Sequence, residues 1–483
     1  MRMRTLAAVH GALLWALSLP ASSPRDLAEA VRPVRTAGAY ETVARLSSPE
    51  YAGRLTGTEG FERAGRWVAA EAAGAGLKAP AEFPDHLQPY PVLRVSMRAA
   101  SMELIPADGQ GEPRALTMFK DFMPILTSSA GEVTSEVVFA GFGITAPELG
   151  RDDYAGLDVK GRIVVVLRGE PKDGRDWSAY NDSHARYANA ASHGAAACLL
   201  ADQAVASPNG EPLTGTLTGE ISTAFADELL AEKGLKCDDL RKALEAGGAV
   251  SFPTGRRLRY SVDAGPPVLS TGFNVLAVLP GSDPGLRGEC VVLGAHLDHC
   301  GDWPRLLPGA DDNASGSAAL LEAARAAARL RPRPARSLVF AWFGGEEMGL
   351  LGSKHLAAHF PASLGRPVAV LNLDMVGAGN GAWVAAGQNH PAIYAALETA
   401  RDRVEPTFQL KAGLSRGEAR ADHGPFLKAG IPAVSLFGMG GKHVGYHTPE
   451  DTVYFITPRT IEASARVALA AAILLADAPP GPG

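Results

Sequence analysis

The C-terminal half of the chain alternates between short apolar runs and longer segments with the composition of helices. Apolar runs such as 290–295 and 337–343 are typical of strands that are buried on both faces of a parallel sheet. Beyond residue 265 we expect strands at 274–279, 290–295, 337–343, 368–373 and 433–437, and helices at 317–330, 350–360, 391–404 and 458–476. This alternation predicts an α/β fold, a mixed sheet flanked by helices.

Before residue 265 the pattern is less regular. Residues 27–77 predict helical pieces, interrupted by the turn-rich stretch 53–60, and the Ala-rich run 61–75 ends at Gly76 as helices often do. From about Tyr90 the sequence becomes strand-like, with strands expected at 138–144, 162–167 and 196–200 and a helix at 185–192. At 483 residues the chain is too long for one ordinary core, so we expect two or more domains.

The first residues have the pattern of an export signal. Arg2 and Arg4 give a basic start, residues 6–19 are mostly apolar, and Ala21-Ser22-Ser23 offers small residues for cleavage. The alternatives are an uncleaved anchor or a buried helix, although the apolar run is short for a membrane span. No later segment is long and apolar enough to cross a membrane, so we expect a secreted or periplasmic protein without stable membrane insertion.

Composition and charge narrow the class of function. The chain has 46% hydrophobic and 20% charged residues and a formal net charge of -6, with no basic run that predicts a nucleic-acid partner. Cys290 and Cys300 bracket an expected strand whose ends lie about 30 Å apart, at about 3.3 Å per residue, so they are not expected to pair. Nothing in the spacing of Cys198 and Cys237 indicates a disulfide, and we expect free, buried thiols.

Residues that bind metals or move protons follow four of the expected strands. They are His296, the pair Glu346-Glu347, Asp374 and His447, and the adjacent Asp311 and Asp312 precede the helix at 317–330. In open α/β sheets the carboxyl ends of parallel strands meet at one edge, so these side chains are expected to converge. Two imidazoles and three carboxylates suit zinc, with one carboxylate shared by two ions. The residues alone do not choose between Asp311 and Asp312.

Each of these residues also has an ordinary structural interpretation. A Glu-Glu pair is usually a solvated turn, and an Asp at a strand end is often a helix cap. If the site forms, one carboxylate of the Glu346-Glu347 pair binds metal and its neighbour accepts a proton from water. His355 and His359 have helical spacing but lack the Glu between them that a zinc-protease helix carries. His299 and His423 suit indirect or pocket roles, and Asp298 is placed to orient His296.

Several motifs together resemble the M28 family of di-zinc aminopeptidases. They are HLDH at 296–299, GADDNASG at 309–316, GEEMGLLGS at 345–353, NLDMVG at 372–377 and YHTPEDT at 446–452. Residues 54–77 resemble the N-terminal helical part of the family. The chain departs from the family pattern at Cys300, a place that is often apolar. Residues 138–144, 152–157, 160–166 and 185–200 are similar to a protease-associated (PA) domain, which implies a lid or substrate-access role.

The resemblance implies the role of each site residue. The metal ligands would be His296, Asp312, Glu347, Asp374 and His447, with Asp312 as the bridge between two zinc ions. Glu346 would be the general base, Asp298 would orient His296, and Tyr446 would steady the oxyanion. The expected organisation is a signal peptide at 1–23, peptidase segments at 24–125 and 266–477, a mainly-β or α+β PA domain at 126–265, and a disordered tail at 478–483.

The function that the resemblance implies is an exported zinc aminopeptidase. A water bridging the two ions would attack the first peptide bond of a peptide substrate, and Glu346 would carry its proton to the leaving amine. The alternatives are another enzyme of this type, a carboxypeptidase or a one-zinc glutaminyl cyclase, or a receptor-like binding protein that has lost ligands. Arg416, Arg420 and Phe426 lie near the expected pocket by their position before the last strand. The sequence leaves the preferred N-terminal residue and the oligomeric state open.

Overall fold

The computed structural model describes residues 25–106, 111–210, 212–213, 215–414 and 420–479. The expected signal at 1–23, Arg416 and most of the expected tail lie outside these residues. Within them, no helix is both long enough and apolar enough to pass through a membrane.

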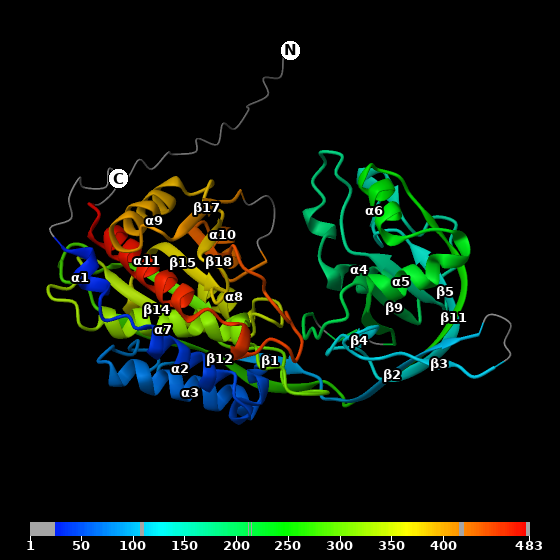
Figure 1. Ribbon diagram of the computed structural model, residues 1–483, viewed down its shortest axis with the longest axis horizontal. Coiled ribbons are helices and arrows are strands. Elements are labelled where there is room, and N and C mark those ends of the chain that lie inside the picture. Colours follow the sequence, from blue (N-terminus) through cyan, green and yellow to red (C-terminus); the bar gives the residue numbers. More distant parts are fainter. Residues whose placement is uncertain (1–24, 107–110, 211, 214, 415–419, 480–483) are drawn as a thin grey trace, which may run out of the picture.

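Two sheets, each of eight strands, form the cores of two domains that lie side by side (Figure 1). The first sheet has the order β1-β12-β14-β13-β15-β18-β16-β17. Its strands are β1 (Leu87–Arg94), β12 (Val268–Leu279), β13 (Glu289–His296), β14 (Ser337–Phe343), β15 (Arg366–Asp374), β16 (Gly381–Ala385), β17 (Gln409–Ala412) and β18 (Ala433–Met439). The four central strands β14, β13, β15 and β18 are parallel neighbours, so their carboxyl ends share one edge.

Helices cover both faces of the first sheet, as the sequence predicted. One face packs against α1 (Leu27–Val31), α2 (Thr36–Leu46), α3 (Glu59–Gly74), α7 (Gly316–Ala327), α9 (Pro391–Val404) and α11 (Pro458–Asp477). The other face packs against α8 (Leu351–Ala358) and α10 (His423–Lys428). Because side chains alternate along a strand, Val291 and Leu293 of β13 enter the first core and Cys290 and Val292 enter the second. This explains why the strand is apolar at every position from Cys290 to Ala295.

The second domain is also a mixed sheet between helices. Its order is β3-β2-β11-β5-β8-β9-β10-β4, with β5, β8, β9 and β10 parallel. Its strands are β2 (Met97–Ile105), β3 (Arg114–Ala115), β4 (Phe122–Pro124), β5 (Gly131–Ala140), β8 (Ile163–Leu167), β9 (Ala197–Asp202), β10 (Leu217–Ser222) and β11 (Ser251–Ala264). Helix α4 (Ser183–Ser192) covers one face, and α5 (Thr223–Leu230) and α6 (Cys237–Glu245) cover the other. The two short strands β6 (Thr145–Ala146) and β7 (Arg151–Asp152) pair separately.

The chain passes between the domains twice. It leaves the first sheet after β1 and enters the second at β2, and it returns between β11 and β12. By sheet pairing, the first crossing lies at residues 95–96, well before the expected boundary at 126, because β2 pairs with β11 along most of its length. The second crossing, at residues 265–267, adjoins the expected boundary at 265.

Some elements were not predicted from the sequence. The strands β16 and β17 lie at the edge of the first sheet and are short, and α5, α6 and α10 are brief helices whose apolar faces cover small areas. Such segments carry too few periodic positions to distinguish them from loops. All four cysteines are free and buried, as expected.

Arg54 attaches the N-terminal helices to the loops around the strand ends. Its side chain is fully buried, and its guanidinium donates to the carbonyl oxygens of Leu297 at 2.9 Å, Leu46 at 2.5 Å, Pro308 at 2.8 Å and Gly309 at 2.9 Å. Burial lowers the pKa of Arg54 to about 10, an effect that nearby carboxylates oppose, so the group keeps its charge at neutral pH. The hydrogen bonds therefore stabilise three separate segments through one side chain.

We expect Arg54→Met to lower the free energy of unfolding by about 3–5 kcal/mol, because it leaves buried carbonyl oxygens without donors. Arg63→Met is the matched control: Arg63 also donates to a backbone carbonyl, that of Glu50, but is exposed, so its loss should cost at most about 0.5 kcal/mol. Urea unfolding followed by fluorescence measures both. Equal unfolding midpoints for the two variants would contradict this role of Arg54.

Candidate metal centre

The predicted ligands lie together at the carboxyl edge of the four parallel strands. His296 is the last residue of β13 and Asp374 the last of β15, whereas Glu347 follows β14 and His447 lies in the loop after β18. Asp312 stands between β13 and α7. The convergence follows from the sheet order, since the strands that carry these residues are adjacent and point the same way.

The five side chains form two triplets that share Asp312. In the first, His296 Nε2 lies 3.3 Å from Asp312 Oδ1 and 3.4 Å from Asp374 Oδ1. In the second, His447 Nε2 lies 3.0 Å from Asp312 Oδ2 and 3.0 Å from Glu347 Oε2. Each oxygen of Asp312 therefore faces a different imidazole. All five side chains are buried.

The hydrogen bonds of the two imidazoles decide which ring nitrogen faces the carboxylates. His296 Nδ1 lies 3.2 Å from the carbonyl oxygen of Asp298, and His447 Nδ1 lies 2.8 Å from the carbonyl oxygen of Ala206. A carbonyl only accepts, so both Nδ1 atoms carry hydrogen, and in the neutral rings the Nε2 lone pairs face carboxylate oxygens. A proton on Nε2 or a metal ion between the groups removes the repulsion of this arrangement. The donor set of nitrogen and oxygen atoms fits zinc.

The structure gives Asp311 and Asp312 different surroundings. Asp311 Oδ1 accepts from the Gly377 N–H at 2.8 Å, and its other oxygen pairs with His443. That hydrogen bond raises the pKa of His443 to about 9. Asp311 thus belongs to a separate ion pair, and Asp312 alone lies between the two imidazoles. His443 was not identified from the sequence, because no motif that we interpreted includes it.

Two further residues that sequence reasoning missed hold the loop of Asp312. The carboxylate of Asp451 accepts from the N–H groups of Asp311 at 2.8 Å and Asp312 at 3.0 Å. Asn313 donates to the carbonyl of Leu373 at 2.9 Å and accepts from the N–H of Met375 at 3.1 Å, which ties this loop to the strand end that carries Asp374. Both residues stand within recognised motifs, but their contacts are long-range and not visible in the spacing.

Asp298 contacts His296 mainly through its backbone. Its carbonyl oxygen lies 3.2 Å from His296 Nδ1, whereas its carboxylate lies 3.8 Å from the same atom. The carboxylate instead accepts from the N–H of Glu346 at 3.2 Å. Asp298 therefore lies beside both the imidazole that it was expected to orient and the backbone of the expected base.

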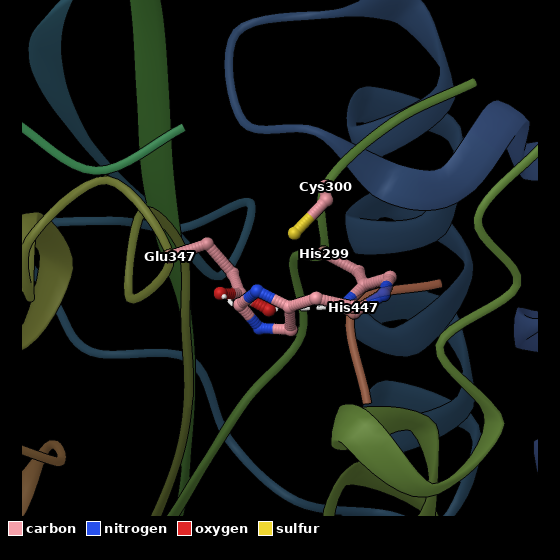
Figure 2. A group of neighbouring side chains, drawn as sticks. All are labelled: His299, Cys300, Glu347 and His447. Atoms are coloured by element: carbon pink, nitrogen blue, oxygen red, sulfur yellow. Dashed lines mark hydrogen bonds and ion pairs between the residues drawn. The ribbon is translucent and has the colours of Figure 1, made fainter. Parts of the chain in front are cut away.

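His299 and Cys300 lie beside the second triplet, and Figure 2 shows both with Glu347 and His447. His299 Nδ1 lies within hydrogen-bond distance, 2.8 Å, of Glu347 Oε1, and so it holds the carboxylate whose other oxygen faces His447 (Figure 2). Cys300 Sγ lies 3.7 Å from the carbonyl oxygen of Ala206. Burial raises the pKa of the Cys300 thiol above its usual range.

Glu346 and Tyr446 stand at the open side of the centre. A ligand atom of Glu346 lies within 4.8 Å of ligand atoms of His296 and Glu347. Burial raises the pKa of Glu346 well above its usual range; His296 opposes the shift and the charge of Glu347 adds to it. The ring of Tyr446 stacks on His447 with centroids 3.9 Å apart, and Tyr446 is 42% exposed.

Of the five other described residues singled out in the sequence, only Arg420 lines the cavity; His423, expected in an indirect or pocket role, is buried and does not line it. His355 and His359 stack on each other with centroids 4.5 Å apart, and neither belongs to a metal-compatible cluster among the described residues. Phe426 is fully buried and packs near Phe343 in the core, so it lies near the cavity, which Pro425 and Leu427 line, without lining the cavity itself. Arg420 does line the cavity next to the centre.

A cavity of about 2200 Å³ lies between the two domains and reaches the centre. Glu346, Glu347, Tyr446 and His447 line it from the first domain, and residues of the second domain, among them Trp177, Asp202 and Glu220, line it from the other side. At its border, Arg420 donates to the carbonyl oxygen of Asn181 in the second domain at 2.9 Å. A molecule that reaches the centre through this cavity contacts both domains.

Two parts of the chain are similar to known protein families. Residues 274–472 match Peptidase family M28 and residues 133–232 match the PA domain. Leupeptin-inactivating enzyme 1 of Streptomyces exfoliatus is 37% identical over 177 residues, which are 35% of this chain and 36% of that protein. An aminopeptidase of Pseudomonas aeruginosa is 27% identical over 437 residues, which are 87% of this chain and 72% of that protein. The chain thus spans little more than a third of the first relative's length.

Solved structures share the fold over nearly the whole chain. The aminopeptidase from Aneurinibacillus sp. strain AM-1 superposes with a TM-score of 0.67 at 24% identity, and covers 94% of this chain and 97% of its own. The zinc aminopeptidase BSAP from Bacillus subtilis superposes with a TM-score of 0.60 at 20% identity, and covers 91% of this chain and 94% of its own. Both sheets therefore belong to a fold that is already known.

Because Asp311 and Asp312 have different surroundings, substitutions of the two residues should affect metal binding differently. Asp312→Asn removes the charge between the two imidazoles, and we expect it to reduce bound zinc from about two ions per chain to fewer than one. Asp311→Asn is the control; it keeps an oxygen that can accept from the Gly377 N–H and should retain both ions. Elemental analysis after dialysis measures the content. The reverse order of losses would mean that Asp311 is the shared ligand.

Proposed function

We propose that this chain is an exported zinc-dependent aminopeptidase of peptidase family M28, with two ions per chain and a PA domain. The match of residues 274–472 to Peptidase family M28 and of residues 133–232 to the PA domain supports this proposal. Its substrates would be peptides with a free N-terminus, from which it would remove the first residue. The names of its relatives support this activity, since the Pseudomonas aeruginosa protein is called an aminopeptidase and BSAP a zinc aminopeptidase. Export is supported by the basic and apolar pattern of residues 1–23.

The observation that carries the proposal is the pair of triplets that share Asp312. A single ion would need only one of them, yet both bring an imidazole Nε2 within 3.4 Å of two carboxylate oxygens. The complete set argues against a one-zinc cyclase and against a binding protein that has lost ligands. His296, Asp312 and Asp374 would hold one ion, and His447, Asp312 and Glu347 the other.

Zinc, when bound, supplies a Lewis acid that polarises the scissile carbonyl and lowers the pKa of water. The chain's own residues then have defined tasks. Glu346 accepts a proton from the attacking water and delivers it to the leaving amine, and its position beside His296 and Glu347 places it next to the water that would be activated. The backbone N–H of Glu346 donates to Asp298, which limits the movement of the base. Tyr446, exposed to the cavity, donates a hydrogen bond to the developing oxyanion.

The cavity between the domains supports peptides as the substrate class. It reaches the carboxylate of Glu346 from one side and polar residues of the PA domain, including Arg168 and Glu220, from the other. An extended peptide bound there has its N-terminal residue at the metal centre and its following residues beside the second domain. This arrangement suits removal of single residues from one end.

The assignment of the base is tested by Glu346→Gln. This variant keeps the size and polarity of the side chain but cannot accept the proton, so we expect kcat to fall by about 10²–10⁴ with zinc content unchanged. Hydrolysis of aminoacyl p-nitroanilides, with elemental analysis of the same sample, gives both values. A fully active, zinc-loaded Gln variant would remove Glu346 from the reaction.

The reaction itself is tested by removing and restoring the metal. Chelation should abolish hydrolysis of aminoacyl p-nitroanilides, and titration with zinc should restore it with saturation near about two ions per chain. C-terminally free N-blocked dipeptides and peptides with N-terminal Gln are assayed in parallel. Turnover of the blocked dipeptides would indicate a carboxypeptidase, and ring closure of N-terminal Gln with one bound ion would indicate a cyclase.

A further inference from the structure

A loop of the PA domain contacts a proposed metal ligand directly. Ala206 follows β9, and its carbonyl oxygen lies 2.8 Å from His447 Nδ1. The contact is reciprocal, because the N–H of Ala206 donates to the carbonyl oxygen of His447 at 3.1 Å. Ala206 is fully buried, and Cys300 Sγ approaches the same carbonyl oxygen at 3.7 Å.

The loop of Ala206 is fastened to the body of the PA domain. The N–H of Leu126 donates to the carbonyl oxygen of Ser207 at 2.7 Å, and Ile125 and Ser207 form a parallel bridge next to β4. Thr127 donates to the carbonyl oxygen of Asn209 at 3.3 Å. Any displacement of the PA domain therefore moves the carbonyl group of Ala206 away from His447.

An apolar cluster spans the domain boundary at this point. Met123, Leu126 and Ala206 from the PA domain pack with Cys300 and Leu307 from the peptidase domain. Burial of this cluster stabilises the docked position of the loop. The carbonyl of Ala206 is thus presented to His447 by packed side chains on both sides.

The hydrogen-bond acceptors of the two imidazoles come from different domains. His296 has its acceptor two residues along the same chain segment, at Asp298, whereas the acceptor of His447 belongs to the other domain. In both cases the acceptor sets the tautomer and the angle of the ring, and so directs the Nε2 lone pair. Only the triplet of His447, Asp312 and Glu347 therefore depends on how the domains dock.

We infer that the PA domain is a structural part of the metal centre, with the carbonyl group of Ala206 as the positioning group for His447. This inference rests on the proposed function, because it concerns the affinity of that same site for zinc. It assigns to the PA domain a role besides covering the cavity. Undocking of the PA domain lowers the affinity of the His447 triplet for zinc and leaves the His296 triplet as it is.

A backbone ester weakens the carbonyl of Ala206 as an acceptor and also removes the N–H of residue 207, so it is read together with the side-chain variant described below. Replacing residue 207 with lactic acid converts the peptide bond between residues 206 and 207 into an ester, whose carbonyl is a weaker acceptor. Ser207→Ala is the matched control, because it has the same side chain and an intact amide. The ester and the Ser207→Ala control are each combined with Asp374→Ala, which removes a residue of the His296 triplet and leaves the His447 triplet intact. In a second pair of variants, each is combined with Glu347→Ala, which leaves the His296 triplet intact.

With Asp374→Ala, we expect the ester to bind zinc about tenfold more weakly than the amide control in competition with a chelator. With Glu347→Ala, ester and amide should bind zinc equally. In ¹⁵N-histidine spectra of the otherwise unaltered zinc-loaded chain, the ester should shift the Nδ1–H resonance of His447 and leave that of His296 unchanged. Equal zinc affinities in both backgrounds, with an unchanged His447 resonance, would overturn the inference.

If the ester does not fold, a side-chain variant tests the same inference. Ala206→Val adds methyl groups at a fully buried position and should displace the loop, so the same selective loss of affinity at the His447 triplet is expected. Ala204→Val in the same loop is its control. Equal loss at both triplets would show general destabilisation and contradict the inference. Failure of the proposed function gives a different result from failure of this inference, because in that case the unaltered chain would bind no zinc or hydrolyse no aminoacyl substrate.

Discussion

The structure depends on the position of one carboxylate, that of Asp312. Its two oxygens face two imidazoles that come from opposite ends of the peptidase sequence, His296 and His447. Buried like charges repel strongly, and Asp374 and Glu347 stand beside it. Cations among these acids would offset the repulsion, and the hydrogen bonds at the Nδ1 atoms of His296 and His447 direct the two Nε2 lone pairs toward the carboxylates.

The framework around Asp312 is held by hydrogen bonds that do not use the oxygens of Asp312. Asp451 accepts from the backbone at Asp312, and Asn313 joins the same loop to the end of β15. Arg54 donates to carbonyl groups on three segments without pairing to a site carboxylate. The loop is therefore rigid without competing for the oxygens that face the imidazoles, which is what a preorganised metal site needs.

The inserted PA domain changes the chemistry available at this edge of the sheet. It closes one side of the cavity, and it contributes a backbone acceptor to His447. Without this domain, His447 would lose the acceptor at Nδ1, and only the stacking of Tyr446 and the contacts with Asp312 and Glu347 would orient its ring. Domain docking, substrate access and the geometry of one triplet are thus physically linked through a single loop.

The sequence by itself determined the α/β fold of the first domain and, through its motifs, indicated the class of enzyme that is proposed above. The apolar run at 290–295 predicted β13 because a strand buried on both faces has no polar positions. Strand ends that finish in His296 and Asp374 predicted convergence, because parallel strands share an edge.

The choice between Asp311 and Asp312 came from a motif, and only the tertiary structure separated their surroundings. It alone also placed Ala206 against His447 and brought β2 into the second sheet. Contacts between residues far apart in the chain leave no periodic or spacing signal, so folding in three dimensions decided them.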